Sequence, residues 1–347
     1  MIQLLDVIQK QLNLKLPFVC YLKPNSFDWN LIVQHTDELV TFNGQKGFVF
    51  FPFEKGNKIV IPFKKDCFSS GSLAFSEDTI LRKATYEFNN TEKEAFEKLV
   101  ARGIESIEDG IFQKVVLSRK IVIKAFISEI ATFKNLIFTY PNAFRYLFFH
   151  PKVGLWMGAT PEQLIQINDS HFETVALAGT QLYSENITWS KKEVEEQQIV
   201  TDFIVQSIEG KVKHFEVSES NTVQAGNLAH IKSIISGELT NDYTPSEIVE
   251  DLHPTPAVCG LPKEESKAFI LSNERYDRAY YTGFLGEWNM NKNTDLFVNL
   301  RCLQVEAHAV NIYVGCGITK DSNPEKEFFE TENKSFTMRT ILVNKKV

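Results

Sequence analysis

The sequence predicts an α+β protein in which antiparallel sheets pack face to face. Short runs of alternating apolar and polar residues, rich in β-branched and aromatic side chains, recur along the chain with a few helical segments between them. No GxGxxG turn follows a predicted strand and no P-loop is present. The pattern therefore favours neither a dinucleotide-binding βαβ fold nor a nucleotide phosphate site.

Each predicted element rests on its own pattern. Residues 1–16 have an amphipathic helix pattern with polar residues throughout, which argues against a signal peptide or membrane span and favours a cytoplasmic protein. The segment 91–110 has helical spacing and ends in glycine, whereas 113–124 is a β-branched alternating run. Further strands are predicted at 47–53, 57–63, 145–150, 154–160, 162–168 and 171–180, further helices at 190–209, 263–274 and 324–342, and a hairpin from 294–307 and 311–318.

Composition and charge limit the kind of protein. The chain has 347 residues, of which 43% are hydrophobic and 28 are phenylalanine, so it can bury the core of one large domain or two small ones. A formal net charge of -7 argues against nonspecific binding to nucleic acid or membranes. The five cysteines are scattered without a CxxC pair, which disfavours a zinc site or disulfide framework and fits a reducing cytoplasm.

The helix predicted at 190–209 carries a carboxylate where an apolar side chain is expected. Ser190 and Glu193 have the spacing of a capping box at its start. Glu196, Val200 and Phe203 then fall at i, i+4 and i+7, so Glu196 extends the core-facing stripe by one turn. The alternative is a glutamate that is present only because the positive end of the helix dipole favours it.

The helix predicted at 324–342 brings charged side chains onto one face. Glu327, Glu330 and Lys334 lie at i, i+3 and i+7, and the same row continues through the apolar Met338 and Ile341. A surface salt-bridge ladder would also explain Glu330 and Lys334. Carboxylates at the head of inward-facing stripes on two helices could instead supply hard oxygen ligands to Mg²⁺, which takes one or two carboxylates and completes its shell with water and substrate.

Eight motifs occur in order along the chain: KVVLSR (114–119), GATPE (158–162), ALAGT (176–180), HPTPAVCGLPKE (253–264), YDRAYYTGFLGEW (276–288), VNLRC (298–302), VGCGI (314–318) and SNPEKEFFETENK (322–334). In this order and spacing they resemble the chorismate-binding enzymes, a family of anthranilate, aminodeoxychorismate, salicylate and isochorismate synthases. The resemblance implies two large antiparallel sheets packed together and flanked by helices, with the site in a cleft between them. It covers about residues 90–345, so 91–347 is expected to be the catalytic region and 1–90 the N-terminal part of the same domain.

Three positions separate the reactions within the family. A lysine at the position of Lys114 is typical of members that use water, whereas the ammonia-using members lack it. Ala178 stands where aminodeoxychorismate synthases carry a lysine, and HPTPAV (253–258) is similar to the isochorismate synthase form. The resemblance therefore implies an isochorismate synthase without a glutamine amidotransferase subunit, with salicylate synthase as the alternative. From the strand pattern alone, Lys114 could equally belong to a cationic solvent face with Lys120 and Lys124.

The resemblance also implies a magnesium site and a dianionic substrate, chorismate. Glu196 and Glu330 would hold Mg²⁺ against the ring carboxylate, with Glu327 as an outer partner through water. Arg301 and Lys334 would bind the enolpyruvyl carboxylate, for which a planar guanidinium has suitable geometry.

The same resemblance assigns the proton transfers. Lys114, as a neutral amine, would take a proton from the water that attacks C2, and Glu162 would protonate the departing C4 hydroxyl. Glu162 must then keep its proton near neutral pH, which requires burial or a neighbouring carboxylate. Further substrate contacts are expected from five small residues, namely Gly179, Thr180, Ala257, Gly315 and Gly317.

Three residues depart from the family pattern. Gln197 stands where isochorismate synthases commonly have histidine, Cys316 replaces a usual alanine between two glycines, and Glu287 is a candidate extra acid near the site. Without the resemblance, Gly315 and Gly317 would indicate a bulged strand. The motifs are compatible with either menaquinone or siderophore biosynthesis and set no oligomeric state.

Overall fold

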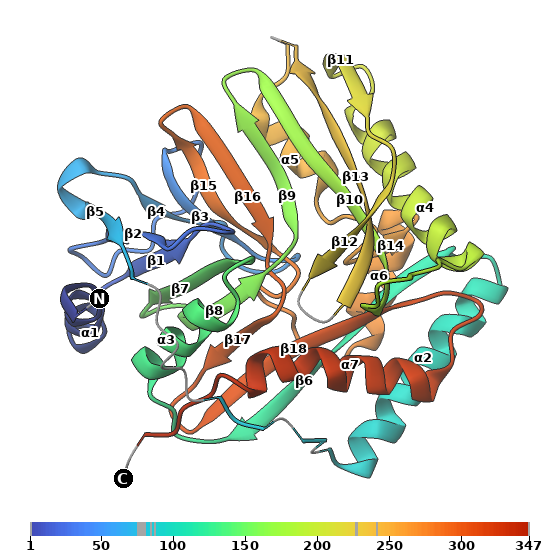
Figure 1. Ribbon diagram of the computed structural model, residues 1–347, viewed down its shortest axis with the longest axis horizontal. Coiled ribbons are helices and arrows are strands. Elements are labelled where there is room, and N and C mark those ends of the chain that lie inside the picture. The colour runs from blue at the N-terminus through green and yellow to red at the C-terminus, as the bar shows by residue number, and fades with distance from the viewer. Residues whose placement is uncertain are drawn as a thin grey trace.

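Two antiparallel sheets of nine strands each pack face to face in the computed structural model, which describes residues 2–74, 81–83, 85–86, 88–225, 228–240 and 242–345. Figure 1 shows the two sheets splayed apart at the end that carries α2, α4 and α7. The first sheet, in spatial order, consists of β14 (Gly260–Leu261), β6 (Lys114–Lys124), β18 (Ala309–Ile318), β17 (Cys302–Val305), β8 (Gly154–Thr160), β7 (Phe144–His150), β1 (Phe18–Leu22), β2 (Asp28–Val33) and β5 (Phe68–Ser72).

The second sheet takes its strands from different parts of the chain. Its N-terminal strands come from residues 47–62, so the first ninety residues contribute to both sheets. In spatial order it consists of β11 (Val212–Val217), β13 (Leu228–Leu239), β10 (His171–Leu182), β9 (Gln163–Asn168), β16 (Asn293–Val298), β15 (Phe284–Met290), β3 (Gly47–Phe51) and β4 (Ile59–Pro62), with β12 (Asn221–Ala225) paired to β13.

An aromatic core fills the space between the sheets. Phe50 of β3 stacks on Tyr280 with ring centroids 4.2 Å apart, and Trp156 of β8 stacks on Tyr313 of β18 at 5.1 Å. These side chains are buried or nearly so. Their alternation along the strands directs one face of each sheet inward, which explains the strongly aromatic composition.

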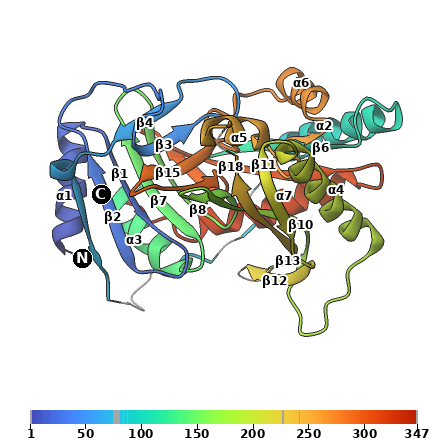
Figure 2. The same cartoon turned by 90° about the horizontal axis from the view of Figure 1, so that it is seen from above.

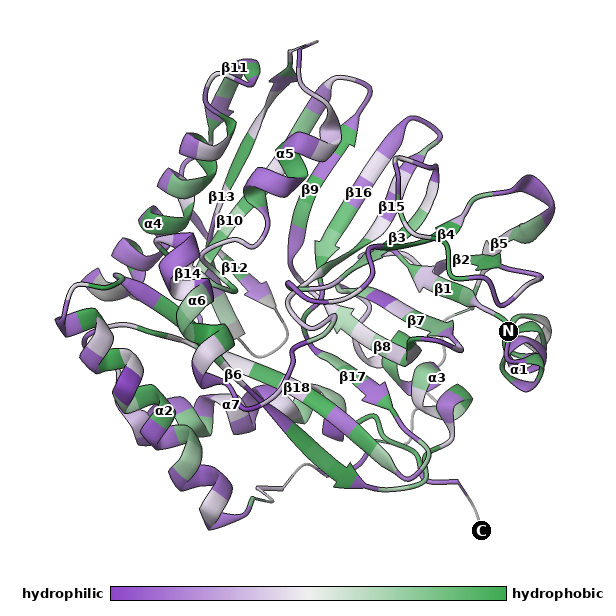
Figure 3. Ribbon diagram, turned by 180° about the vertical axis from the view of Figure 1, so that it is seen from behind, coloured by the Kyte–Doolittle hydropathy of each residue, from purple (hydrophilic) through white to green (hydrophobic). Residues whose placement is uncertain are grey.

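Helices cover the outer faces of both sheets. The helix α1 packs on α3 and β1, α3 also packs on β7 and β8, and α4 packs on β10 and β13 (Figures 1 and 2). Figure 3 colours α2 and α4 in alternating hydrophobic and hydrophilic bands, as expected for amphipathic surface helices. The helices are α1 (Ile2–Leu14), α2 (Asn90–Glu108), α3 (Glu129–Thr139), α4 (Lys191–Ile208), α5 (Pro245–Leu252), α6 (Lys263–Asn273) and α7 (Pro324–Arg339), with a 3₁₀ turn at Lys65–Cys67.

The predicted fold class is confirmed, but the predicted strand at 294–307 is wrong. The chain leaves the second sheet at the end of β16 and enters the first as β17, and only β17 forms the hairpin with β18. At the crossing, Asn299 is fully buried; its side-chain amide donates to Tyr280 O at 2.8 Å and its carbonyl accepts from Tyr146 Oη at 2.6 Å. Two residues later Arg301 has φ 46°, which breaks the extended pattern.

The buried stripe of α4 lies one residue away from the predicted one. Glu196 and Phe203 are half-buried at its edge, whereas Val200 is in the core. Because Glu196 lies at the edge of the buried stripe, its side chain points past the core and toward β18. The buried residues of α4 are Gln197, Val200, Thr201, Ile204 and Ile208.

Candidate active site

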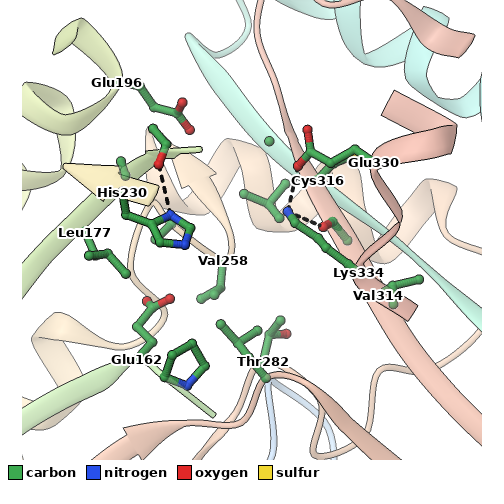
Figure 4. Close-up of a pocket in the computed structure, with 18 of the residues that line it drawn as sticks. Glu162, Leu177, Glu196, His230, Val258, Thr282, Val314, Cys316, Glu330 and Lys334 are labelled. Carbon is green, nitrogen blue, oxygen red and sulfur yellow. Dashed lines mark hydrogen bonds and ion pairs between the residues drawn. The ribbon is translucent and has the colours of Figure 1, made fainter. Parts of the chain in front are cut away.

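A cavity of about 270 Å³ lies where the two sheets diverge, between α4 and α7. Its wall is assembled from segments that are far apart in sequence, as Figure 4 shows for the residues labelled there. Of the twelve residues predicted for the site, the structure brings together the following eleven in this one lining: Lys114, Glu162, Gly179, Glu196, Ala257, Arg301, Gly315, Gly317, Glu327, Glu330 and Lys334. The side chain of the twelfth, Thr180 in β10, lies outside the described residues.

Lys114 projects from the first residue of β6 into this pocket and is only 2% exposed. The interpretation as a solvent face is therefore wrong for Lys114, although Lys120 and Lys124 on the same strand are exposed. The Lys114 Nζ lies 2.6 Å from Glu196 Oε1, so the pair joins β6 to α4. A buried lysine side chain needs such a partner because leaving a polar group unpaired away from water is costly.

Gly317 of β18 makes room for this ion pair. A Cβ atom at this position would lie 3.1 Å from Lys114 Cε and 3.3 Å from Glu196 Oε1. The pairing of β18 with β6 is continuous from Ala309 to Ile318, so the glycines of this motif belong to a regular strand and not to a bulge. Close approach of the backbone to the charged pair is the physical reason for glycine here.

Glu162 lies on the opposite wall, in the turn between β8 and β9. Its backbone is fixed on both sides, because Val298 N donates to Glu162 O at 2.9 Å and Glu162 N donates to Thr160 Oγ1 at 3.3 Å. Figure 4 shows the carboxyl group facing the cavity near Leu177 and Val258. Desolvation raises the pKa of Glu162 to about 7, although the positive charges of Lys114 and Lys334 oppose this rise.

The third wall is cationic and comes from β18, α7 and the crossing after β16. Lys334 Nζ donates to Glu330 Oε1 at 2.7 Å and to Gly315 O at 3.0 Å. Arg301 Nη1 donates to Thr337 Oγ1 at 3.1 Å, and burial lowers the pKa of this guanidinium from its usual value. Two cations are thus held by backbone, hydroxyl and carboxylate oxygens in the cavity lining, where an anionic ligand can reach them.

Sequence reasoning did not include His230 of β13, a titratable group in the lining. Its Nδ1 lies 3.0 Å from Gly179 O and donates to it, because a carbonyl can only accept. Desolvation lowers the pKa of His230 to about 4, so the ring is neutral near pH 7 and its Nε2 is an acceptor. Gly179, at φ 68°, presents this carbonyl from a conformation that favours glycine. The sequence feature that could have pointed to His230 is its polar position in the alternating run AHIK (229–232).

Comparisons with known proteins identify the family. The sequence model of the family described as chorismate binding enzyme matches residues 66–343. The chain belongs to this family. It is 29% identical over 318 residues to "Isochorismate synthase DhbC" of Bacillus subtilis, an alignment that covers 84% of this chain and 79% of the relative.

Other relatives show how far the likeness extends. "Anthranilate synthase component 1" of Archaeoglobus fulgidus is 30% identical over 253 residues, covering 70% of this chain and 61% of the relative. The solved structure of MenF, the menaquinone-specific isochorismate synthase from Escherichia coli, superposes with a TM-score of 0.77 at 19% identity and covers 94% of this chain and 88% of that chain. At that identity, the structural likeness supports the fold alone.

The oxygen donors of this chorismate-binding enzyme fit a hard cation. Glu196, Glu327 and Glu330 line the same pocket, and Mg²⁺ prefers carboxylate and water oxygens. Among the described residues, however, no three His, Cys, Asp or Glu side chains form a ready-made cluster. A bound Mg²⁺ would therefore be held by one or two of these carboxylates and complete its shell with water and substrate oxygens.

The departures from the family pattern fall in three different surroundings. Gln197 is buried outside the pocket lining, where its amide donates to Thr201 Oγ1 at 2.9 Å and Ser233 Oγ at 3.0 Å. Cys316 lines the pocket, and burial raises the pKa of its thiol well above the usual value.

The expectation that Glu287 is an extra acid near the site is wrong. Glu287 Oε1 accepts from Tyr21 Oη at 2.6 Å and Oε2 lies 2.7 Å from Lys23 Nζ, between the sheets and outside the pocket lining. Register explains its place, since Glu287 lies opposite Phe48 of β3 and Asp295 of β16 within the second sheet. Separately, none of the helices in the described ranges is both long and apolar enough to cross a membrane.

Proposed function

We propose that the protein is an isochorismate synthase, which converts chorismate to isochorismate by adding water at C2 and releasing the C4 hydroxyl. The observation that carries the proposal is the placement of Lys114 and Glu162 on opposite walls of one pocket, with the pKa of Glu162 raised to about 7. A carboxyl group that keeps its proton near neutral pH can act as a general acid toward a leaving hydroxyl. Likeness to isochorismate synthases over most of the chain supports the same assignment.

The proposed reaction balances in protons and atoms. The turnover starts with Lys114 as a neutral amine and Glu162 protonated. Lys114 Nζ then takes a proton from the water that attacks C2, and Glu162 gives its proton to the hydroxyl that leaves C4 as water. One water enters and one leaves, so the product is an isomer of the substrate. For the next turnover, the proton on Lys114 must return to Glu162, through solvent or bound water. Glu196 Oε1, 2.6 Å from Lys114 Nζ, holds the lysine side chain in the pocket.

Substrate binding follows from the charges on the walls. Chorismate carries two carboxylates, and Arg301 and Lys334 are the buried or half-buried cations that would bind the enolpyruvyl group. Glu196 and Glu330 would hold Mg²⁺, with Glu327 as an outer partner. When bound, Mg²⁺ would neutralise the ring carboxylate and withdraw electron density from the diene.

Product analysis tests the proposal. Purified protein is incubated with chorismate and Mg²⁺, and the products are separated and identified by proton NMR, with lactate dehydrogenase present to detect pyruvate. We expect isochorismate without pyruvate. Pyruvate with salicylate would establish the alternative, salicylate synthase, whereas an aminated product on addition of ammonium would indicate the anthranilate branch. Chorismate recovered intact would refute all three assignments.

A further inference from the structure

The motif YDRAYYTGFLGEW contains an arginine whose contacts the proposed chemistry does not use. Arg278 and Glu274 form a buried ion pair in which each side chain is 2% exposed, with Arg278 Nη2 2.6 Å from Glu274 Oε1 and Nε 2.8 Å from Oε2. Although burial lowers the pKa of Arg278, the Glu274 carboxylate raises it above its usual value, so the guanidinium stays charged. Neither residue lines the pocket.

The remaining donors of Arg278 all reach residues that do line the pocket. Its Nη2 donates to Val116 O on β6 at 2.6 Å, and its Nη1 donates to Val258 O at 3.0 Å and to Thr282 Oγ1 at 3.3 Å. These three residues belong to three separate segments of the lining, namely β6, the loop after α5 and the turn before β15. One planar group with five N–H donors therefore contacts all three segments at once.

Glu274 extends the same contact to the strand that carries the catalytic lysine. Its Oε1 accepts from Ser118 N at 2.7 Å and from Ser118 Oγ at 2.9 Å. Within the described part of the chain, β14 pairs with Lys114 and Val115, and no other strand follows it along that edge of β6. The carboxylate thus takes the place of a partner strand two residues past Val116.

The turn beneath the pocket needs such support. Thr282 has φ 59°, a conformation that is rare for a β-branched residue, and it is fully buried. Its N–H donates to Asn299 O at 2.9 Å while its hydroxyl accepts from Arg278. A strained residue persists only where surrounding contacts hold it, and Arg278 supplies one of them.

We propose that the Glu274–Arg278 pair positions the active site, fixing the strand that carries Lys114, the loop that carries Ala257 and Val258, and Thr282 in one arrangement. Stability alone is a weak reason for a buried ion pair, because well-packed apolar residues often replace one without loss. The role of Lys114 in this inference rests on the proposed isochorismate synthase reaction. Both residues act through others and are positioning residues.

The test compares Arg278→Lys with a matched variant, Arg145→Lys. Arg145 is also fully buried and also donates to backbone carbonyls, those of Ala143 at 3.0 Å and Ser26 at 2.6 Å among them, but none of its partners lines the pocket. Thermal unfolding first defines a temperature at which each variant is fully folded. At that temperature kcat and KM for chorismate are measured with Mg²⁺, together with amide hydrogen exchange over residues 114–118.

Arg278→Lys is expected to lose on the order of 10²-fold in kcat with a smaller change in KM, the effect of a misplaced catalytic group. Its amides at 114–118 should exchange faster than in the unmodified protein. Arg145→Lys should lower the melting temperature while kcat, KM and that exchange stay unchanged. If Arg278→Lys fails to fold, Glu274→Gln takes its place, with the same expectations. A fully folded pair variant with unchanged kcat and exchange overturns the inference.

The two proposals fail separately. If the unmodified protein leaves chorismate unchanged, the proposed function is refuted and the exchange measurement alone decides the positioning role. In that case faster exchange at 114–118 in Arg278→Lys, but not in Arg145→Lys, supports it, and equal exchange in both overturns it.

Discussion

The glutamates of the pocket lie in two opposite surroundings. Glu162 faces the cavity near apolar neighbours, and desolvation raises its pKa to about 7. Glu196 and Glu330 each lie within hydrogen-bond distance of a lysine, at 2.6 Å from Lys114 and 2.7 Å from Lys334. The first environment suits a proton donor, and the second suits carboxylates that pair with a cation.

The largest expected effect is at Lys114, the partner of Glu196. Lys114→Ala should lower kcat by about 10³–10⁴-fold, near the upper range for a lost proton transfer, because it removes the proposed base, which is held 2.6 Å from Glu196. Steady-state turnover of chorismate measures it, and added ethylamine should restore part of the rate. Lys124→Ala, on the exposed end of the same strand, is the control and should leave kcat unchanged. Turnover near that of the control in Lys114→Ala would exclude the base role.

The next largest loss of turnover is expected at Glu162. Glu162→Gln keeps the shape of the side chain but has no proton to give, so kcat should fall by about 10²–10³-fold. In the unmodified protein Glu162 is active only while protonated, so kcat/KM should decline as the pH rises through about 7. A pH profile of kcat/KM checks this, and the residual activity of Glu162→Gln should lack that decline. A decline that persists in the variant would assign it to another group.

The sequence predicts the charged residues of α7 better than it predicts Glu162. Glu327, Glu330 and Lys334 share a face by helical spacing alone, and all three line the pocket. Glu162 is an ordinary turn residue by pattern, and what gives it a raised pKa is contact with residues from β10 and the loop before α6, which no local period encodes. Only the family resemblance points to it.

The wrong predictions also come from contacts between residues that are far apart in sequence. The segment 294–307 reads as one strand because its apolar alternation continues across residues 299–301, although the chain changes sheets there. Glu287 precedes a tryptophan in a family motif, yet the register with β3 and β16 places it between the sheets beside Lys23. Arg278 was part of a recognised motif without a role, since its partners lie 4 to 162 positions away in sequence.

A smaller effect concerns the cation. Glu196→Gln should weaken Mg²⁺ binding by about 10–100-fold, because an amide oxygen carries no charge to offset that of the metal. Calorimetric titration of the protein with Mg²⁺ in the absence of chorismate gives a readout independent of turnover. Glu195→Gln, the exposed neighbour on α4, is the matched control and should titrate like the unmodified protein. Equal affinities in the two variants would remove Glu196 from the metal site.

The smallest effect runs in the opposite direction, toward greater stability. The pKa of Glu162 is raised from 4.5 to about 7 on folding, so below pH 4.5 the residue is protonated in both states and does not alter the free energy of unfolding. As the pH rises from 4.5 to 7 only the unfolded chain releases the proton, and the folded state is progressively disfavoured, by at most about 3 kcal/mol above pH 7. Half-burial of the side chain makes the measured value smaller.

Glu162→Gln should therefore be more stable than the unmodified protein at pH 8 and equally stable near pH 4.5, as measured by urea unfolding without substrate. Groups that titrate identically in both proteins cancel in this difference, so the pH dependence reports on position 162 alone. A variant that is slower in turnover yet more stable at high pH would show that the apolar surroundings of Glu162 serve catalysis, because they keep the carboxyl group protonated at a cost in stability. A stability difference that does not change with pH would mean that the carboxyl group is solvated. The contrast between Glu162 and the lysine-paired Glu196 and Glu330 would then be lost.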